Sequence, residues 1–252
     1  MTTPAIGRPV RTSLGASAAW PLSFAIIFGS FCTGAELEQN SFAGARAAMV
    51  TDQIARRGVS DPRVLAAMRE VPRHQFVPPA DQAHAYDDSP LPIGHGQTIS
   101  QPYIVALMTE IVRPRASDRA LEIGTGSGYQ SAVLSRLVGN VDTIEIVESL
   151  AREADRRLKD LGYANVTVRA GDGYAGWPER GPFDIIIVTA APDHVPQPLV
   201  EQLARGGRMV IPVGSPYEGQ ELRLIEKDDS GQVRTRQVAP VRFVPLTRGR
   251  GN

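Results

Sequence analysis

Three glycines at alternate positions follow an apolar run in the sequence LEIGTGSGYQ, residues 121–130. Gly124, Gly126 and Gly128 remove side chains from a turn, which lets a ligand approach the backbone closely. The spacing is G-x-G-x-G, and Tyr129 stands where a dinucleotide-binding fingerprint has its third glycine. We expect this loop to contact a ligand. Tight packing of a strand against a helix is the alternative reason for such glycines.

Two acidic residues follow the next two predicted strands. Glu145 ends the second strand, about twenty residues after the glycines, where a carboxylate can accept hydrogen bonds from both hydroxyls of a ribose. Asp172, in AGDGY, follows the third strand and is positioned to contact an adenine. Each acid, taken alone, is more typical of a surface or capping residue. Because the carboxyl ends of parallel strands meet at one sheet edge, together they predict a site for an adenosine-containing ligand, with no phosphate required.

A doubly wound α/β sheet would bring these residues together, and the chain alternates strand and helix as that fold requires. The strands are continuous apolar runs, as expected when helices cover both faces. The predicted strands are 119–123, 141–147, 166–170, 183–189 and 208–213, and the predicted helices lie near 129–138, 149–161 and 197–204. The segments 222–227 and 234–244, joined by DDSG, predict an antiparallel addition to the sheet edge.

A helical lead-in precedes this core. It begins near Ser41, and SDPRVLAAMREV predicts a helix with Ser60 or Asp61 as cap and Pro62 in its first turn. Prolines between residues 72 and 92 then predict an irregular stretch ending in IGHGQTISQPY. We expect one domain over residues 36–252. Its parts are the lead-in and substrate segment at about 41–112, the cofactor-binding core at about 117–214 and the C-terminal strands at about 220–246.

The first 35 residues differ in composition from the rest. Arg8 and Arg11 precede an apolar stretch from Trp20 to Phe31 and a small-residue site at 33–35, features of a secretory signal peptide. The alternative is a disordered extension. The apolar stretch is too short, and too interrupted by Pro21, for a transmembrane helix.

Composition excludes several other classes. The chain has 252 residues, 42% of them hydrophobic, and no net formal charge, so it can bury a core and offers no basic surface to a nucleic acid. Cys32 is the only cysteine, which excludes an internal disulfide and a thiolate metal cluster, and the four histidines lack ligand spacing. We expect no metal, no nucleic-acid partner, no stable membrane association and a monomeric chain.

The glycine loop and the segments IEIVESL, AGDGY, FDIIIVTAAP and GGRMVIPVG resemble the successive motifs of class I methyltransferases that use S-adenosylmethionine. More narrowly, PIGHGQTISQPYIVALMTE, VTAAPDHVPQPLVEQLARGGRMVIPVG and VRFVPLT resemble the protein-L-isoaspartate O-methyltransferase family. The resemblance runs from Met49 to Arg248, and GQTISQP is the segment that separates this family from other methyltransferases.

The resemblance implies a repair reaction. Such enzymes methylate the α-carboxylate of L-isoaspartyl residues in damaged proteins and peptides. The ester collapses to a succinimide that reopens partly to aspartate, and S-adenosylhomocysteine is the other product. The resemblance assigns the active-site role to Ser100, with Gln97 and Thr98 as supporting contacts. The small residues Ala190 and Ala191, at the end of the fourth predicted strand, are expected to let the substrate or cofactor approach closely. The resemblance implies a cofactor-binding set of Glu122, Gly124, Thr125, Gly126, Ser127, Gly128, Glu145, Asp172 and Gly173.

From the residues alone, Ser100 is more simply the cap of the helix that begins near Pro102. The chemistry is compatible with an orienting role, because a carboxylate is already ionised at neutral pH and needs no general base. A carboxylate and a sulfonium neutralise each other as they react. Alignment and exclusion of water should therefore dominate, and GQTISQP is the candidate cover.

Two other functional classes stay open: a methyltransferase acting on a small molecule or RNA, and a noncatalytic adenosine-binding module. The family and the cytoplasmic supply of S-adenosylmethionine favour the cytoplasm. The signal-like residues 1–35 leave export as the alternative.

Overall fold

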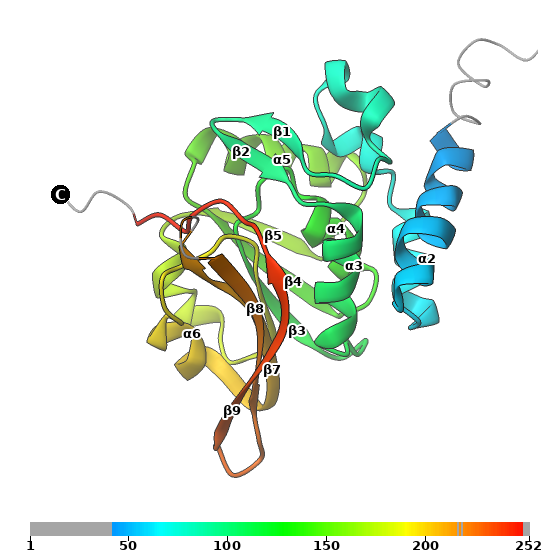
Figure 1. Cartoon of the computed structure of the whole chain (residues 1–252). Helices are drawn as coiled ribbons and strands as arrows, with labels where there is room; N and C mark the ends of the chain where they lie inside the picture. Colours follow the sequence, from blue (N-terminus) through cyan, green and yellow to red (C-terminus); the bar gives the residue numbers. More distant parts are fainter. Residues whose placement is uncertain (1–41, 216, 218, 249–252) are drawn as a thin grey trace, which may run out of the picture.

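The computed structural model describes residues 42–215, 217 and 219–248 (Figure 1). Within them a seven-stranded sheet has the order β5-β4-β3-β6-β7-β8-β9. The first five strands of that order are parallel, and β8 and β9 add antiparallel to β7. The strands are β3 (Arg119–Ile123), β4 (Asn140–Glu145), β5 (Val166–Ala170), β6 (Phe183–Val188), β7 (Leu203–Ser215), β8 (Gly219–Lys227) and β9 (Val233–Val241). The predicted doubly wound sheet and its antiparallel edge are confirmed.

Helices cover both faces of this sheet. Successive residues of a strand point to opposite faces, so the apolar residues of the central strands are buried on both sides. Ala120 of β3 and Ile187 of β6 belong to one buried cluster, and Leu121 and Ile186 belong to another. The first cluster includes residues of α2, α3 and α4, and the second includes Leu199 of α6. The α-helices after residue 60 are α2 (Pro62–Glu70), α3 (Pro102–Ile111), α4 (Tyr129–Ser135), α5 (Glu148–Asp160) and α6 (Gln197–Gln202). Before them the described chain is helical from residue 42 and continues through η1 (Met49–Ile54) and η2 (Ala55–Arg57).

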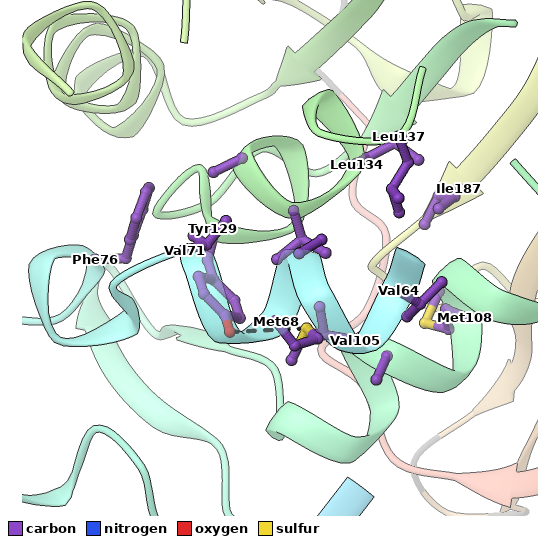
Figure 2. Packing of buried hydrophobic residues seen from close by; sticks show 14 of the residues in the cluster. Val64, Met68, Val71, Phe76, Val105, Met108, Tyr129, Leu134, Leu137 and Ile187 are labelled. Carbon is purple, nitrogen blue, oxygen red and sulfur yellow. Dashed lines mark hydrogen bonds between the residues drawn. The ribbon is translucent and has the colours of Figure 1, made fainter. Parts of the chain in front are cut away.

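The helical lead-in packs on the α4 side of the sheet. Figure 2 shows Val64 and Met68 of α2, and Val71 directly after it, in one cluster with Val105 of α3 and Leu134 of α4. The spacing of Val64, Met68 and Val71 puts them on the same side of the helix. The expected cap is confirmed: the side chain of Asp61 accepts a hydrogen bond from the N–H of Arg63 at 2.9 Å.

The stretch expected to be irregular contains a hairpin that the sequence did not predict. Short 3₁₀ segments, η3 (Arg73–Phe76) and η4 (Pro79–His84), are followed by β1 (Leu91–Gly94) and β2 (Gln97–Ile99), which pair antiparallel. The turn between the strands has positive φ at Gly94, His95 and Gly96, with φ of 88°, 53° and 68°. This hairpin carries the GQTIS residues toward the glycine loop.

Several element boundaries differ from the prediction: β4 ends at Glu145 rather than at 147, α4 ends at Ser135 rather than at 138, and β9 ends at Val241 rather than at 244. The largest difference is at the start of β7. The helix expected over 197–204 ends at Gln202, and the strand expected from 208 begins at Leu203. The cause is an irregular pairing of β7 with β6, in which Phe183 pairs with Leu203 but Ile185 pairs with Arg208. The additional residues lie in this irregularity, so the apolar pattern of 208–213 marks only the regular part of the strand.

The signal-like residues 1–35 lie outside the part of the chain that the structure describes. In the described part, no helix has the length and apolar character needed to cross a membrane.

Candidate active site

The glycine loop between β3 and α4 needs glycine for two reasons. Gly124, Gly126 and Gly128 have φ of 95°, 52° and 90°, which side chains rarely adopt. A side chain on Gly124 would also overlap Thr189 at the end of β6, and one on Gly128 would press against Leu158 of α5. Tight packing therefore accounts for two of the glycines, while Gly126 lies beneath the β1–β2 hairpin and borders open space.

Glu145 ties the end of β4 to this loop. Its carboxylate accepts a hydrogen bond from the N–H of Gly126 at 2.8 Å and another from the N–H of Val147 at 2.9 Å. The residue is 5% exposed and lines the cleft beside the loop. Because each carboxylate oxygen has more than one acceptor position, Glu145 can also accept hydrogen bonds from a ligand.

Two spaces border the glycine loop. The first, which we call the glycine-loop cleft, has about 520 Å³ of empty space and is lined by Gln97, Thr98, Gly126, Glu145, Gly173 and Ala190 among others. The second, the inner pocket, has about 310 Å³ and is lined by Ser100, Glu122, Thr125 and Ser127 among others. The two spaces share Thr98, Gly124, Gly126 and Thr189, so they are direct neighbours.

Glu122 is fully buried at the side of the inner pocket. Its Oε2 accepts hydrogen bonds from the hydroxyls of Ser131 and Thr143, the latter at 2.7 Å, and Thr143 also pairs with Thr125 at 2.7 Å. Burial raises the pKa of Glu122 to about 8, more than its two hydroxyl donors lower it. Its Oε1 has no partner among the described residues. An orphaned buried oxygen at a pocket wall is suited to a polar or cationic ligand.

Ser100 does not cap α3, so the capping prediction is wrong. The N-cap residue is Gln101, and no side chain caps the helix. Gln101 instead donates to the carboxylate of Asp88 at 2.8 Å. The Ser100 hydroxyl forms no hydrogen bond within the described part of the chain. It lines the inner pocket and also a groove between α3 and the end of β9.

Three of the expected site residues line neither the cleft nor the inner pocket, although the structure describes all three. Gly128 packs against Leu158, as stated above. Asp172 caps a 3₁₀ turn, η5 (Gly173–Ala175), by accepting from the N–H of Tyr174 at 2.9 Å. Ala191 donates to the carbonyl of Val244 at 2.8 Å and accepts from the N–H of Leu246 at 2.9 Å.

Ala191 thereby holds the 244–247 segment against the end of β6. Val244, Pro245, Leu246 and Thr247, which belong to the VRFVPLT segment, line the glycine-loop cleft.

Thr189 lines both spaces, and the sequence did not predict it as a site residue. Its hydroxyl donates to the carbonyl of Gly124 at 2.6 Å and fixes the loop. Its signal was a hydroxyl residue at the last position of the fourth predicted strand.

Neither notable histidine lines the two spaces. His95, in the β1–β2 turn, lies with its Nε2 3.0 Å from the hydroxyl of Ser149 at the start of α5, so the pair connects the hairpin to the core. His194 is exposed, as expected of a surface residue.

A parallel sheet with a glycine loop after its first strand, a carboxylate at the end of the next and a two-part space between them is the arrangement of class I methyltransferases that use S-adenosylmethionine.

Residues 45–251 match the family model described as protein-L-isoaspartate(D-aspartate) O-methyltransferase. A relative from Syntrophobacter fumaroxidans with the name protein-L-isoaspartate O-methyltransferase 2 is 60% identical over 189 residues, covering 75% of this chain and 76% of the relative. One from Nitrosospira multiformis, protein-L-isoaspartate O-methyltransferase 1, is 54% identical over 231 residues, covering 90% of this chain and 98% of the relative. The chain belongs to this family.

Solved structures agree. A protein-L-isoaspartate O-methyltransferase superposes with a TM-score of 0.72 at 33% identity, covering 81% of this chain and 66% of the other. A putative one from Plasmodium falciparum, in complex with S-adenosyl-L-homocysteine, has a TM-score of 0.69 at 26% identity, covering 81% of this chain and 99% of the other. The family resemblance stated from the motifs is confirmed, and the chain is an S-adenosylmethionine-dependent methyltransferase.

Proposed function

We propose that the chain transfers a methyl group from S-adenosylmethionine to the α-carboxylate of L-isoaspartyl residues in damaged proteins and peptides, and that Ser100 holds that carboxylate. One observation carries the proposal. Among the described residues that line these spaces, Ser100 alone borders both the inner pocket and the groove between α3 and β9. A polypeptide in the groove could therefore present one side group to a donor in the inner pocket.

The residues of the two spaces fit S-adenosylmethionine. In the glycine-loop cleft, the Glu145 carboxylate is available to ribose hydroxyls. Gly173, at the start of η5, lines the part of the cleft proposed for the adenine, and its missing side chain lets the chain pack closely against Ile123 of β3. In the inner pocket, the partnerless Oε1 of Glu122 suits the ammonium of the methionine part, with Thr125 and Ser127 beside it. When bound, S-adenosylmethionine supplies the methyl group and a positive sulfonium.

Ser100 suits an acceptor carboxylate because its hydroxyl is a free donor at the beginning of a ten-residue helix. Anions are favoured at helix N-termini, and a hydrogen bond to a carboxylate is stronger than one between neutral groups. We assign Ser100 an orienting role, not a nucleophilic one, since the carboxylate is ionised at neutral pH and attacks directly. Thr98 and Gln97, at the end of the hairpin, and Ala190, after β6, complete the positioning set.

Exclusion of water is the second contribution of the chain. The β1–β2 hairpin covers the glycine loop, with Cδ1 of Ile93 only 3.3 Å from the position that a Cβ on Gly126 would occupy. The contact between His95 and Ser149 attaches the hairpin tip to α5. Water stabilises the separated charges of a carboxylate and a sulfonium more than their neutralised transition state, so a dry site lowers the barrier. Orientation of the reactants can contribute up to about 7 to 11 kcal/mol.

Methyl transfer converts the carboxylate into a methyl ester, whose carbonyl is more electrophilic and whose methoxy group can leave. The neighbouring backbone nitrogen then closes a succinimide and expels methanol without help from the protein, and hydrolysis returns part of the product to aspartate. Repair follows from repeated cycles of this reaction.

A labelled methyl-transfer assay on isoaspartyl and aspartyl versions of one peptide tests this function. We expect base-labile label on the isoaspartyl peptide only. Label on both peptides would favour a methyltransferase of other specificity. Binding of S-adenosylmethionine without transfer to either peptide would favour the noncatalytic module and refute the proposal.

The organisation of the chain is part of the proposal: a single domain over 36–252, divided near 41–112, 117–214 and 220–246 into substrate segment, cofactor core and edge strands. We also propose a monomer, to be tested by light scattering, and a cytoplasmic location. Sequencing the N-terminus of the protein made in its host tests the location, because Glu36 as first residue would mean export.

A further inference from the structure

The groove that meets the inner pocket at Ser100 has a distinct charge. It is lined on one side by the first residues of α3 and on the other by residues 239–243, at and after the end of β9. Two arginines, Arg57 and Arg242, line it, and none of the described residues that line it is acidic. A polypeptide that reaches Ser100 along this groove therefore passes positive charge.

The two arginines differ in freedom. Arg57 is fixed: its Nη1 donates to the Asp88 carboxylate at 2.6 Å, and its guanidinium lies 3.5 Å from the ring centre of Tyr103. Asp88 thus compensates the charge of Arg57. Arg242 is exposed and has no hydrogen bond or ion pair with any residue that the structure describes. Its five donors remain available to a ligand.

We infer that Arg242 selects isoaspartyl sites whose neighbouring residues in the polypeptide are acidic. The inference rests on the proposed function, since it needs an isoaspartyl residue at Ser100, and it adds a preference for flanking sequence. Arginine binds a carboxylate through two parallel hydrogen bonds, whereas a lysine side chain near Arg242 is repelled. The remaining lining includes Tyr103, Ile104 and Phe243, which can hold apolar parts of the same peptide.

The effect should be moderate because Arg242 is in contact with water. Exposed ion pairs contribute little, and a carboxylate beside Arg242 should raise kcat/KM about threefold relative to a neutral isostere. A lysine at the same positions should lower it by a similar factor. Both effects should shrink at high ionic strength, where charges further apart than a few ångströms are screened.

The test uses three isoaspartyl peptides that carry Glu, Gln or Lys on both sides of the damaged residue. The measured quantity is the ratio of kcat/KM for each charged peptide to kcat/KM for the Gln peptide, at low salt and in 0.5 M salt, which is roughly the range over which screening becomes strong. In Arg242→Gln the ratios should approach one, and in Arg242→Glu the preference should reverse toward Lys. Arg236→Gln is the matched control, because Arg236 is an exposed arginine of β9 outside the groove, and its ratios should equal those of the parent.

Ratios of one in the parent protein, or a preference that survives in both Arg242 variants, would overturn the inference while leaving the methylation of isoaspartate intact. Failure to methylate even the Gln-flanked isoaspartyl peptide would instead refute the proposed function. Thermal midpoints of the three variants show whether each keeps the fold.

Discussion

Replacement of Glu145 by glutamine should weaken binding of the methyl donor and of its product. In the structure, both carboxylate oxygens of Glu145 already accept backbone N–H groups, from Gly126 and from Val147. Glutamine has one acceptor oxygen and one NH₂ group. In either orientation its NH₂ would face a backbone N–H, so one charge-assisted bond is lost and two donors oppose each other. The glycine loop would keep its backbone hydrogen bonds to Ile144 of β4, but the site around residue 145 would lose one of the two bonds that orient it.

The magnitude follows from these bonds. A hydrogen bond to a charged group contributes about 1.5 to 3 kcal/mol, and the substitution also removes the charged acceptor proposed for the ribose hydroxyls. A loss of about 2 kcal/mol raises the dissociation constant about thirtyfold. The same donor conflict should lower the thermal midpoint of the ligand-free protein by about 4 to 8 °C for about 2 kcal/mol in a chain of this size.

Calorimetric titration with S-adenosylhomocysteine measures the affinity without turnover. Glu148→Gln is the matched control, because Glu148 is an exposed acid just three residues further on, at the start of α5, paired with Arg152. We expect its dissociation constant to stay within about twofold of the parent, since exposed pairs contribute little. If Glu145→Gln also binds with parental affinity, or if both variants lose affinity equally, the cofactor role of Glu145 is wrong.

Three other substitutions test the remaining parts of the site. Ser100→Ala should lower kcat/KM for an isoaspartyl peptide about 10- to 100-fold through loss of a hydrogen bond to a carboxylate, while the affinity for S-adenosylhomocysteine stays near parental; an equal loss of that affinity would contradict the division of roles. Gly124→Ala should destabilise by about 3 kcal/mol or more in urea unfolding, because the methyl group meets Thr189 in a backbone with φ of 95°. Gly162→Ala is the control, because Gly162 has φ of 79° but open space around it, and it should lower the free energy of unfolding by only about 1 to 2 kcal/mol. Equal losses of stability in the Gly124 and Gly162 variants would refute the steric argument. Because burial raises the pKa of Glu122 from 4.5 to about 8, the folded protein holds a proton in that pH range that the unfolded chain has lost, so this residue makes stability fall as pH rises from about 4.5 to 8. Glu122→Gln should remove that part of the decline. If the free energy of unfolding changes with pH in the same way for variant and parent between about pH 5 and 8, Glu122 does not titrate as argued.

The central strands were predictable because they are buried on both faces. β3 has the predicted bounds, and an apolar run that ends in glycine or a turn marks such a strand without knowledge of its neighbours. β5, a half-buried strand at the sheet edge, also has the predicted bounds. β7 was predicted too short because its first residues pair irregularly with β6, and that irregularity depends on the partner strand. The same limit explains the missed hairpin. β1 and β2 are short, β1 contains Pro92, and their pairing depends on the fold around them.

The candidate site was predictable to the level of strand ends, and no further. That Glu145 and the glycines would meet follows from the rule for parallel sheets. The bonds from Gly126 and Val147 to Glu145 depend on backbone directions that side-chain types do not reveal. Ser100 illustrates the opposite error. A serine before proline is a good cap by composition, but the chain leaves β2 so that Gln101 holds the cap position and turns its side chain to Asp88.

The two acids of the proposed donor site should contribute unequally to affinity. Glu145 receives two backbone N–H groups before any ligand arrives, so its carboxylate is already oriented and little must be reorganised for further hydrogen bonds. Glu122 is fully buried, and its pKa of about 8 means that at neutral pH it carries a proton. To pair with a cationic ammonium it must first lose that proton, which costs free energy in a buried setting. That cost falls as the pH rises toward about 8, above which the α-amino group of the donor itself loses its proton and the attraction with it. The affinity for the donor should therefore rise through Glu122 only as the pH approaches about 8, whereas the contribution of Glu145 comes from geometry that is present before binding.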